Sequence, residues 1–344
     1  DTIVQGSLDL SHEALDGAIA NIHLLSSGND MHQREVSNRV GTRLPDRVRF
    51  YDKTDEGEKI EIGGDYEFGL GPGRLKLIGL HQLRTNAPGE SATVDYLGAR
   101  PRTGSRVATE SESGESILRG EYSLSDNGSD WQLSLEGAFN YLDNSGQLYA
   151  LSGADYVPVP LPGTDSRVEE RRAESSLVHG RPLTDNLSVQ ASLGGEYSEL
   201  SQTGANGLTR EFVRPKGFVA LSWNSRANWD ATFRVERAVG QLDFADFITS
   251  VQLNNDQNQT NGGNPNLVPE QSWDTELVLN GQTDWSGPVK LRLYYRAIED
   301  VNDKILIERI VNGDGSISIL EGEGNLESAT DYGIEISGTY SLLS

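Results

Sequence analysis

The sequence predicts an all-β fold, an antiparallel up-and-down transmembrane β-barrel, and three observations support this prediction. Apolar and polar residues alternate with a period of two over long segments. The connections between these segments alternate between short turns and long polar links. Tryptophan residues gather beside the short turns. Together these features favour a barrel with an apolar outer face and a polar lumen.

Composition sets the limits within which this prediction stands. The 344 residues could form two ordinary domains or one large all-β domain. Only 35% of the residues are hydrophobic and the net charge is -23, and such values alone would also fit a disordered chain. Long alternating segments rich in Tyr, Trp, Leu and Val argue against disorder.

Several classes of protein are excluded or disfavoured by what the sequence lacks. It has no cysteine, so it can form neither a disulfide nor a thiolate metal site. No apolar run approaches the ~20 residues of a membrane-spanning helix. The first residues carry no signal-peptide pattern, so we expect a mature protein or an excised piece. The acidic balance excludes nucleic acid as a partner, since phosphate contacts need clustered Lys and Arg.

The alternation is clearest in residues 131–141, "WQLSLEGAFNY". Trp131, Leu133 and Leu135 fall on one face of the predicted strand, while Gln132 and Ser134 fall on the other. The same design recurs in residues 187–197, 229–236, 289–296 and 332–340. A half-solvated soluble sheet and a membrane barrel both produce this alternation.

The connections favour the barrel. Links of roughly 15 to 35 polar, Gly-rich residues separate the short turns, and compact soluble sandwiches seldom carry so many structureless loops. We expect residues 86–113, 143–168, 240–269 and 299–330 to be such loops, on the cell exterior. Short periplasmic turns are expected at 14–17, 70–73, 125–130, 183–186, 224–228 and 284–287.

The tryptophans mark one level of the predicted barrel. Trp131, Trp229 and Trp285 lie at or beside a short turn, and Trp223 ends the strand before one. An indole can bury its ring in lipid and still reach water with its N–H. These residues therefore predict an aromatic girdle at the membrane interface.

Two segments resemble a known family. "GNPNLVPEQSWDTELVLNG", residues 263–281, resembles the Asn-Pro-Asn-Leu-x-Pro-Glu segment and following strand of TonB-dependent outer-membrane receptors, and residues 59–82 resemble a barrel hairpin of that family. The prolines Pro265 and Pro269 deny the ladder an N–H donor, so the loop ends where strand pairing begins. After Pro269 the strand would descend with Trp273 toward lipid and Asp274 toward the lumen.

The resemblance predicts only part of a barrel, spanning residues 1–344. Neither a plug domain nor a TonB box is visible, and the C-terminal residues lack the aromatic typical of a last barrel strand. We count about thirteen strands, against about 22 in a plugged transporter. The first strand (3–12) and the last (332–342) would run in the same direction. We therefore expect an incomplete barrel with two unpaired edges.

What the resemblance implies is a receptor in the bacterial outer membrane. Its function would be TonB-dependent uptake of a scarce nutrient of the siderophore, cobalamin or oligosaccharide class. The implied partners are outer-membrane lipid, that ligand, and a TonB-type energy-transducing protein acting through a plug outside this sequence. The alternatives are a passive porin or surface adhesin without a plug, and a soluble all-β binding domain.

No motif predicts chemistry, and we predict no enzyme activity, catalytic residue, cofactor or metal site. The histidines lack metal-ligand spacing, and residues 312–316, "NGDGS", predict a loop tip rather than a calcium loop. The acidic residues of 52–56 and 169–170 are expected to be solvated loop charge. Ligand-binding residues cannot be named from the sequence. Six lumen residues are expected to form cross-strand ion pairs: Arg119, Glu121, Arg234, Glu236, Arg292 and Glu335.

Overall fold

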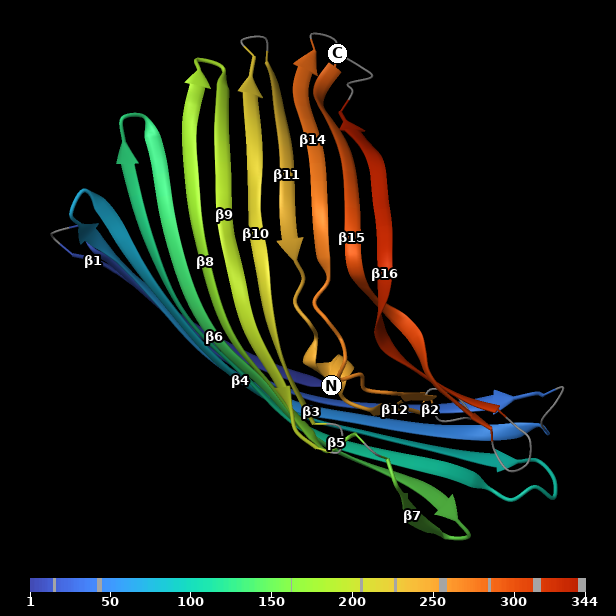
Figure 1. Cartoon of the computed structure of the whole chain (residues 1–344). Helices are drawn as coiled ribbons and strands as arrows, with labels where there is room; N and C mark the ends of the chain where they lie inside the picture. The colour runs from blue at the N-terminus through green and yellow to red at the C-terminus, as the bar shows by residue number, and fades with distance from the viewer. Residues whose placement is uncertain are drawn as a thin grey trace.

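The computed structural model is a single large antiparallel sheet, curved into part of a barrel (Figure 1). It describes residues 1–14, 17–41, 45–161, 163–204, 207–225, 228–253, 259–283, 286–311 and 317–339. No helix among these residues is both long and apolar enough to span a membrane. Thirteen long strands form the sheet: β1 (Thr2–Glu13), β2 (Ile19–Arg39), β3 (Arg47–Leu70), β4 (Gly73–Tyr96), β5 (Thr103–Asp126), β6 (Ser129–Ser152), β8 (Ser166–Thr184), β9 (Leu187–Gln202), β10 (Leu208–Asn224), β11 (Trp229–Val239), β14 (Gln271–Thr283), β15 (Ser286–Val311) and β16 (Ile317–Gly338).

Each long strand pairs with the next long strand along the chain, as the sequence predicts. In the described residues the sheet does not close. β1 pairs only with β2, and β16 meets, beyond β15, only a single parallel bridge between Asn261 and Glu321. The first and last long strands therefore do not pair, which confirms the prediction of an incomplete barrel.

The turns at one end of the sheet are short, as predicted. β3 and β4 are joined through Gly71, β5 and β6 through Asn127 and Gly128, and β8 and β9 through residues 185–186. Asn127 and Gly128 have φ values of 50° and 73°, which is the left-handed geometry of a two-residue hairpin turn. The other three predicted turns, 14–17, 224–228 and 284–287, fall partly outside the described residues.

The prediction of long loops is mostly wrong. Residues 86–96 and 103–113 are paired strand in β4 and β5, and much of 143–168 and 299–330 likewise continues β6, β8, β15 and β16. These extensions carry polar residues on both faces, so the period-two pattern disappears although the backbone ladder continues. Residues 312–316 lie outside the described part.

The strands are consequently much longer than a membrane requires. β3 has 24 residues and β15 has 26, whereas a tilted membrane-spanning strand needs about 9 to 11.

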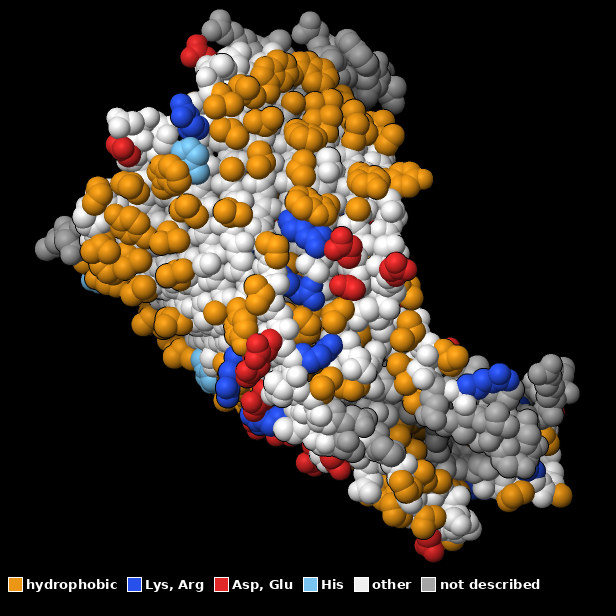
Figure 2. Space-filling model, viewed as in Figure 1, with side chains coloured by type: hydrophobic (Ala, Val, Ile, Leu, Met, Phe, Trp, Pro, Cys, Tyr) orange, Lys and Arg blue, Asp and Glu red, His pale blue; other side chains and the backbone are white. Residues whose placement is uncertain are grey.

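The strand register gives the sheet two different faces. Leu135 and Ile334, on the outer face, are 56% and 71% exposed, and Figure 2 shows hydrophobic side chains covering the half nearest the short turns, with charged side chains gathered toward the other end. This apolar belt matches the predicted lipid face.

Three of the four tryptophans predicted to form the aromatic girdle are described, and they share one face and one end of the sheet. Trp131, Trp223 and Trp229 all belong to the outer-face register near the short turns and are 40%, 44% and 37% exposed. The ring of Trp131 lies against His179, with the ring centroids 4.0 Å apart. Trp285 lies outside the described residues.

The connection between β11 and β14 differs from every other connection. We call residues 240–270, described except for 254–258, the strap. It contains a 3₁₀ helix, η1 (Phe244–Phe247), and two short strands, β12 (Ser250–Gln252) and β13 (Gln259–Asn261). A further short strand, β7 (Asp155–Val159), pairs with β6. The strap turns back onto the inner face of the sheet (Figure 1) and packs there in two hydrophobic clusters.

Candidate functional site

The tip of the strap is held by two charged side chains of the opposite wall. The backbone N–H of Leu253 donates to Glu90 Oε2 over 3.0 Å, and Arg49 donates to the Leu253 carbonyl. Arg49 is only 2% exposed and its guanidinium lies 4.6 Å from the ring centre of Tyr51. Both polar groups of one strap residue are thus bound by wall residues that lie on β3 and β4, far from it in sequence.

An apolar pocket receives the Leu253 side chain, which is fully buried. Complete burial of a leucine contributes roughly 2 to 3 kcal/mol, and a hydrogen bond to a charged group adds about 1.5 to 3 kcal/mol. The buried side chain and two hydrogen bonds to charged groups therefore all hold the tip. The surrounding cluster comes from the inner faces of β3, β4, β5 and β6 and from the strap itself: Tyr51, Ala92, Val107, Leu148, Val251 and Leu253, with Val159 and Leu161 packed against it.

Glu90 is the centre of a small polar network beneath the tip. Lys53 Nζ lies 3.6 Å from its carboxylate, and Glu90 is close enough to Tyr51 to influence the pKa of its hydroxyl. Burial, followed by the charge and hydrogen bond of Glu90, raises the pKa of Tyr51 to about 12. Tyr51 therefore stays protonated even well above neutral pH.

The middle of the strap packs farther along the same face. Asp243 caps η1, because its Oδ1 accepts the Ala245 N–H over 2.9 Å. Gln202 Nε2 donates to the Phe247 carbonyl over 2.9 Å, and the Thr249 N–H donates to Gly163 O over 3.0 Å. The second cluster holds Val168, Leu200, Phe247, Ile248 and Leu267, with Leu142, Phe212, Leu242 and Phe244 against it.

One carboxyl group is placed unfavourably when the strap is docked. Asp246 lies half-buried in η1. Burial, and then the charges of Asp243 and Glu323, raise the pKa of Asp246 to about 6. At neutral pH this carboxylate is ionised among like charges, which works against docking.

The segment Asn264 to Pro269 anchors the root of the strap to β16. Asn264 Nδ2 donates to Glu323 O over 3.0 Å, and its Oδ1 accepts the Asn266 N–H over 2.9 Å. The side chain of Leu267 is fully buried and Arg210 donates to its carbonyl. The motif that marks the end of the loop in the sequence is therefore also the part that fixes the strap to the wall.

Asn325 completes this anchor. It exchanges two hydrogen bonds with Val268, of 2.8 and 2.9 Å, and its Nδ2 also donates to Asp300 O and Asn302 Oδ1, each over 2.7 Å. Asp300 has a φ of 56°, the left-handed region that non-glycine residues rarely adopt. The β15–β16 register skips Asp300, so its carbonyl is free of the ladder and is bound by Asn325.

A cavity of about 300 Å³ remains between the strap and the wall. No charged side chain lines it, although the chain carries a net charge of -23. Hydroxyl, amide and aliphatic groups form its walls, including Val107, Thr109, Leu142, Ile248 and Thr249.

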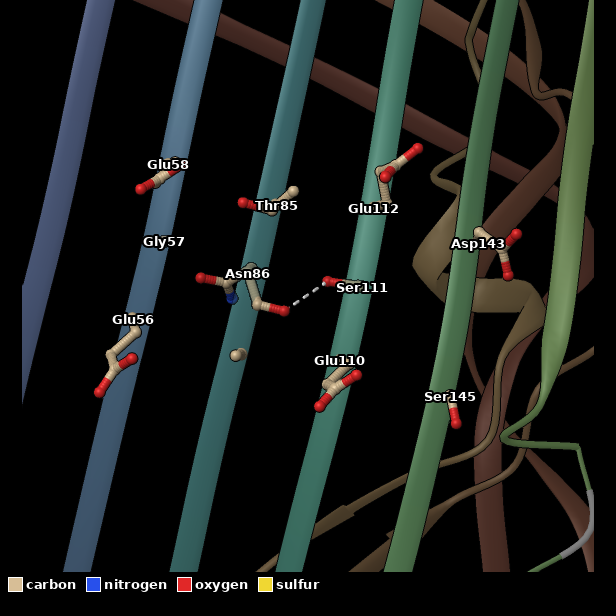
Figure 3. A pocket seen from close by; sticks show the side chains of 11 residues that line it. Glu56, Gly57, Glu58, Thr85, Asn86, Glu110, Ser111, Glu112, Asp143 and Ser145 are labelled. Carbon is tan, nitrogen blue, oxygen red and sulfur yellow. Dashed lines mark hydrogen bonds between the residues drawn. The ribbon is translucent and has the colours of Figure 1, made fainter.

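A second, acidic hollow of about 550 Å³ lies on the outer face. Carboxylates from β3, β5 and β6 line it, and Figure 3 shows them beside Thr85 and Asn86 of β4. Two have partners: Glu112 accepts from the Tyr141 hydroxyl over 2.7 Å, and Asp143 pairs with Arg167 at 3.1 Å. In the described part of the chain no three His, Asp or Glu side chains are arranged to hold a metal ion. The remaining acidic residues of the hollow are Glu56, Glu58 and Glu110.

The predicted lumen ion pairs are only partly cross-strand. Arg292 pairs with Glu335 of β16 at 2.9 Å and with Glu276 of β14. Arg119, however, reaches Glu121 on its own strand at 3.5 Å as well as Glu136 of β6 at 3.4 Å. Arg234 and Glu236 pair with each other at 2.9 Å within one strand, so this contact is not the cross-strand pair that was expected. Side chains two residues apart on a strand share a face, so ion pairs can form within one strand as well as between neighbouring strands.

The acidic residues expected as loop charge lie in strands instead, which corrects that expectation. Asp52 pairs with Arg34 at 3.0 Å and with His32 at 2.9 Å. Glu169 pairs with Arg167 at 2.6 Å, and Glu170 accepts from Asn140 over 3.3 Å. The other histidines occupy separate places: His23 contacts Asp9 at 2.6 Å, His81 contacts Ser116 at 2.9 Å, and His12 is exposed on β1.

The inward strap is the feature that sequence reasoning missed. Its signal was present, because Phe244, Phe247, Ile248, Val251 and Leu253 form an apolar group inside a polar connection. An exterior loop would expose these side chains to water, and their number should have indicated a docked segment.

Comparison with known structures gives the fold. The copper transporter OprC matches with a TM-score of 0.50 and 14% identity, covering 99% of this chain and 58% of that chain. A mutant of the ferric enterobactin receptor PfeA from Pseudomonas aeruginosa gives 0.53 and 12%, covering 99% and 57%. FpvA of P. aeruginosa, bound to a heterologous pyoverdine, gives 0.54 and 13%, covering 98% and 52%.

The chain thus spans between 52% and 58% of these three structures. Neither family models nor curated proteins gave a match. The sheet has the fold of part of a TonB-dependent receptor barrel, which agrees with the predicted incomplete barrel.

Proposed function

We propose that this chain forms part of the wall and mouth of an outer-membrane receptor for TonB-dependent uptake of a scarce nutrient. The observation that carries the proposal is that two features occur together. The sheet is open, apolar outside and charged inside, and the strap folds into its lumen. A wall of this kind encloses a passage, and a strap at its mouth restricts what enters.

The fold comparisons support this proposal. The matched structures are a copper transporter, a ferric enterobactin receptor, and FpvA bound to a pyoverdine with iron. By analogy we propose a metal chelate as the ligand, within the wider class of siderophores, cobalamin and oligosaccharides. Transport rather than catalysis is the proposed activity, with energy supplied by a TonB-type partner through a plug outside residues 1–344.

The open edges argue against a closed passive porin made of residues 1–344 alone. A small porin made by this chain alone would pair β1 with β16, and in the described residues no such pairing exists. An open sheet cannot persist in hydrocarbon, because each unsatisfied backbone group costs several kcal/mol. We therefore propose that further strands complete the wall.

Uptake by cells tests the proposal. Strains with and without the full-length gene would be supplied with ⁵⁵Fe(III)–siderophore complexes, with radiolabelled cobalamin and with labelled oligosaccharides. We expect accumulation of one class that requires both the gene and a TonB-type protein. Uptake that continues without the TonB-type protein would show a passive pore, and no gene-dependent uptake would contradict the receptor function.

A further inference from the structure

Arg181 places a positive charge within the apolar belt of the outer face. It lies three positions before β8 ends at Thr184, about 10 Å along the strand. In the register Arg181 pairs with Val189 of β9, and it shares its face with Leu177, which is 45% exposed. Hydrophobic side chains cover this face around the short turns (Figure 2). The charge is thus surrounded by groups that pack against lipid.

The guanidinium of Arg181 has no partner in the protein. Among the described residues it makes no ion pair, no hydrogen bond and no contact with an aromatic ring. Arginines of the same face that lie farther from the short turns differ in this respect. Arg171 lies 3.7 Å from Glu199, and Arg167 lies 3.1 Å from Asp143. The unpaired cation is therefore found in the lipid-facing part and not in the part that meets water.

Two further polar groups beside Arg181 also lack partners. The ring of His179, two positions earlier on the same face, packs against Trp131 of β6, with the ring centroids 4.0 Å apart. His179 Nδ1 is buried without a hydrogen-bond partner. Within the described chain, neither His179 Nε2 nor the indole N–H of Trp131 has a partner. A guanidinium, an imidazole and an indole N–H therefore gather at one place without a protein acceptor, although polar groups shielded from water are normally paired.

A phosphate group has the oxygen atoms that these side chains require. A guanidinium binds two phosphate oxygens through parallel N–H groups, and the ring N–H groups can donate to a third. The level is also right, because Trp131, Trp223 and Trp229 mark the membrane interface, where lipid headgroups lie. The adjoining apolar belt can receive the acyl chains. The shared chemistry is that of a phospholipid.

The charge of the headgroup follows from what faces the site. His179 and Arg181 pair in the register with Ala191 and Val189, so no carboxylate stands opposite them to bind a headgroup ammonium. An anionic lipid is therefore favoured over a zwitterionic one. General attraction does not explain such a preference, because the net charge of -23 repels anions.

We propose that Arg181, His179 and Trp131 form a binding site for the phosphate of an anionic phospholipid, in the membrane leaflet nearest the short turns. An arginine that only extends to water beside the membrane would hold no lipid class preferentially. The proposal depends on the outer face meeting lipid and not on the uptake of any nutrient. Binding is measured on the purified protein, so its result is independent of transport.

Lipid titration of the full-length protein tests the site. The protein in detergent would receive dioleoylphosphatidylglycerol or dioleoylphosphatidylcholine, and native mass spectrometry would count the lipids retained. Arg181→Gln removes the charge, whereas Arg181→Lys keeps it without the two parallel N–H groups. His179→Phe keeps the ring packing on Trp131 without the nitrogens. Arg171→Gln is the matched control, because Arg171 lies on the same strand and face but pairs with Glu199.

We expect the wild type to bind its first phosphatidylglycerol about tenfold more tightly than phosphatidylcholine. Arg181→Gln should abolish this preference, Arg181→Lys and His179→Phe should each keep part of it, and Arg171→Gln should leave it unchanged. Equal binding of the two lipids by the wild type, or equal losses in Arg181→Gln and Arg171→Gln, would overturn the site. Full preference in His179→Phe would overturn the place of the imidazole in it.

Two controls keep the result interpretable. The folded fraction of each variant is measured by its migration in unheated gels, and if Arg181→Gln folds poorly, Arg181→Lys against the wild type decides. Glycerol 3-phosphate in excess should not displace the lipid, because the acyl chains hold it on the apolar belt. Displacement by this soluble phosphate would overturn the lipid as the ligand.

Discussion

Val268 and Asn325 form a reciprocal pair, in which the Val268 N–H donates to Asn325 Oδ1 over 2.8 Å and Asn325 Nδ2 donates back to Val268 O over 2.9 Å. The side-chain amide thus replaces a strand neighbour for one residue of the strap. It satisfies both backbone groups at the point where Pro269, which lacks an N–H, ends the connection.

Asn325→Ala should loosen the root of the strap. The substitution leaves the Val268 groups and Asp300 O without their partner, at a cost of about 1 to 3 kcal/mol. Hydrogen exchange of the strap amides in the full-length protein would measure the loss of protection. Asn280→Ala, which removes a 2.8 Å bond to Asp230 in the wall, should leave the strap unchanged; equal effects from both would argue against the anchor.

Glu90→Gln should free the tip without freeing the root. The neutral amide weakens the charge-assisted bond to the Leu253 N–H, by roughly 1 kcal/mol or more. We expect faster exchange at residues 248–253 and unchanged exchange at 264–268. Lys53→Gln, which removes a neighbour of Glu90 but no strap contact, is the matched control. Loss of protection along the whole strap would show that tip and root are not separable.

Docking of the strap should weaken as pH rises through about 6. Asp246 has a pKa raised to about 6 in the docked state, so the docked strap binds more protons than the free strap between about pH 4 and 6. Its contribution to docking is fully present below this range and is lost as pH rises through it. Exchange of strap amides from pH 4.5 to 7.5, corrected for intrinsic rates, measures this trend.

Asp246→Asn should flatten that pH dependence, because the amide does not titrate. Asp274→Asn, in the wall beside Arg296, should keep it. A pH profile that is the same in the wild type and in Asp246→Asn would show that another group controls docking.

The membrane face could be predicted from the sequence because lipid imposes a strict rule on every second residue. Leu135 and Gln132 lie an odd number of positions apart in β6. The structure puts Leu135 on the outer face and Gln132 on the inner face, as the alternation predicts. Beyond the apolar belt both faces meet water, so residues such as Glu112 and Ser113 carry no period. The paired extensions were therefore read as loops, although their backbone ladder is continuous.

The strap could not be placed from the sequence, because its contacts depend on residues very far apart. Arg49 and Leu253 are separated by 204 positions, and no local pattern relates them. The Asn264–Pro269 motif was recognised, but only as the end of a loop. Its role as an anchor depends on Asn325, whose position follows from the β15–β16 register, and on the left-handed φ of Asp300.

Arginine on the outer face should impair insertion, whereas arginine on the inner face should be mild. Leu135→Arg and Leu291→Arg place a charge in lipid, which costs roughly 2 to 4 kcal/mol near the midplane. Gln132→Arg and Lys290→Arg place it in the lumen. The amount of protein in the outer-membrane fraction would measure the difference, and equal losses on both faces would contradict the assignment of the lipid face.

The short connections between the strands give a sharper test of topology than the predicted long loops would. The β4–β5 connection is confined to residues 97–102, and the β5–β6 turn to Asn127 and Gly128. Short exposed connections tolerate insertions, so an epitope inserted at either place should leave the sheet intact. On intact cells we expect antibody to bind the epitope at 97–102 and not the one at the turn.

An epitope inside the paired stretch 103–113 should instead reduce the amount of folded protein, because it interrupts the ladder between β4, β5 and β6. Binding at the Asn127–Gly128 turn alone would reverse the orientation and place the strap at the periplasmic side, where it could not control entry from outside.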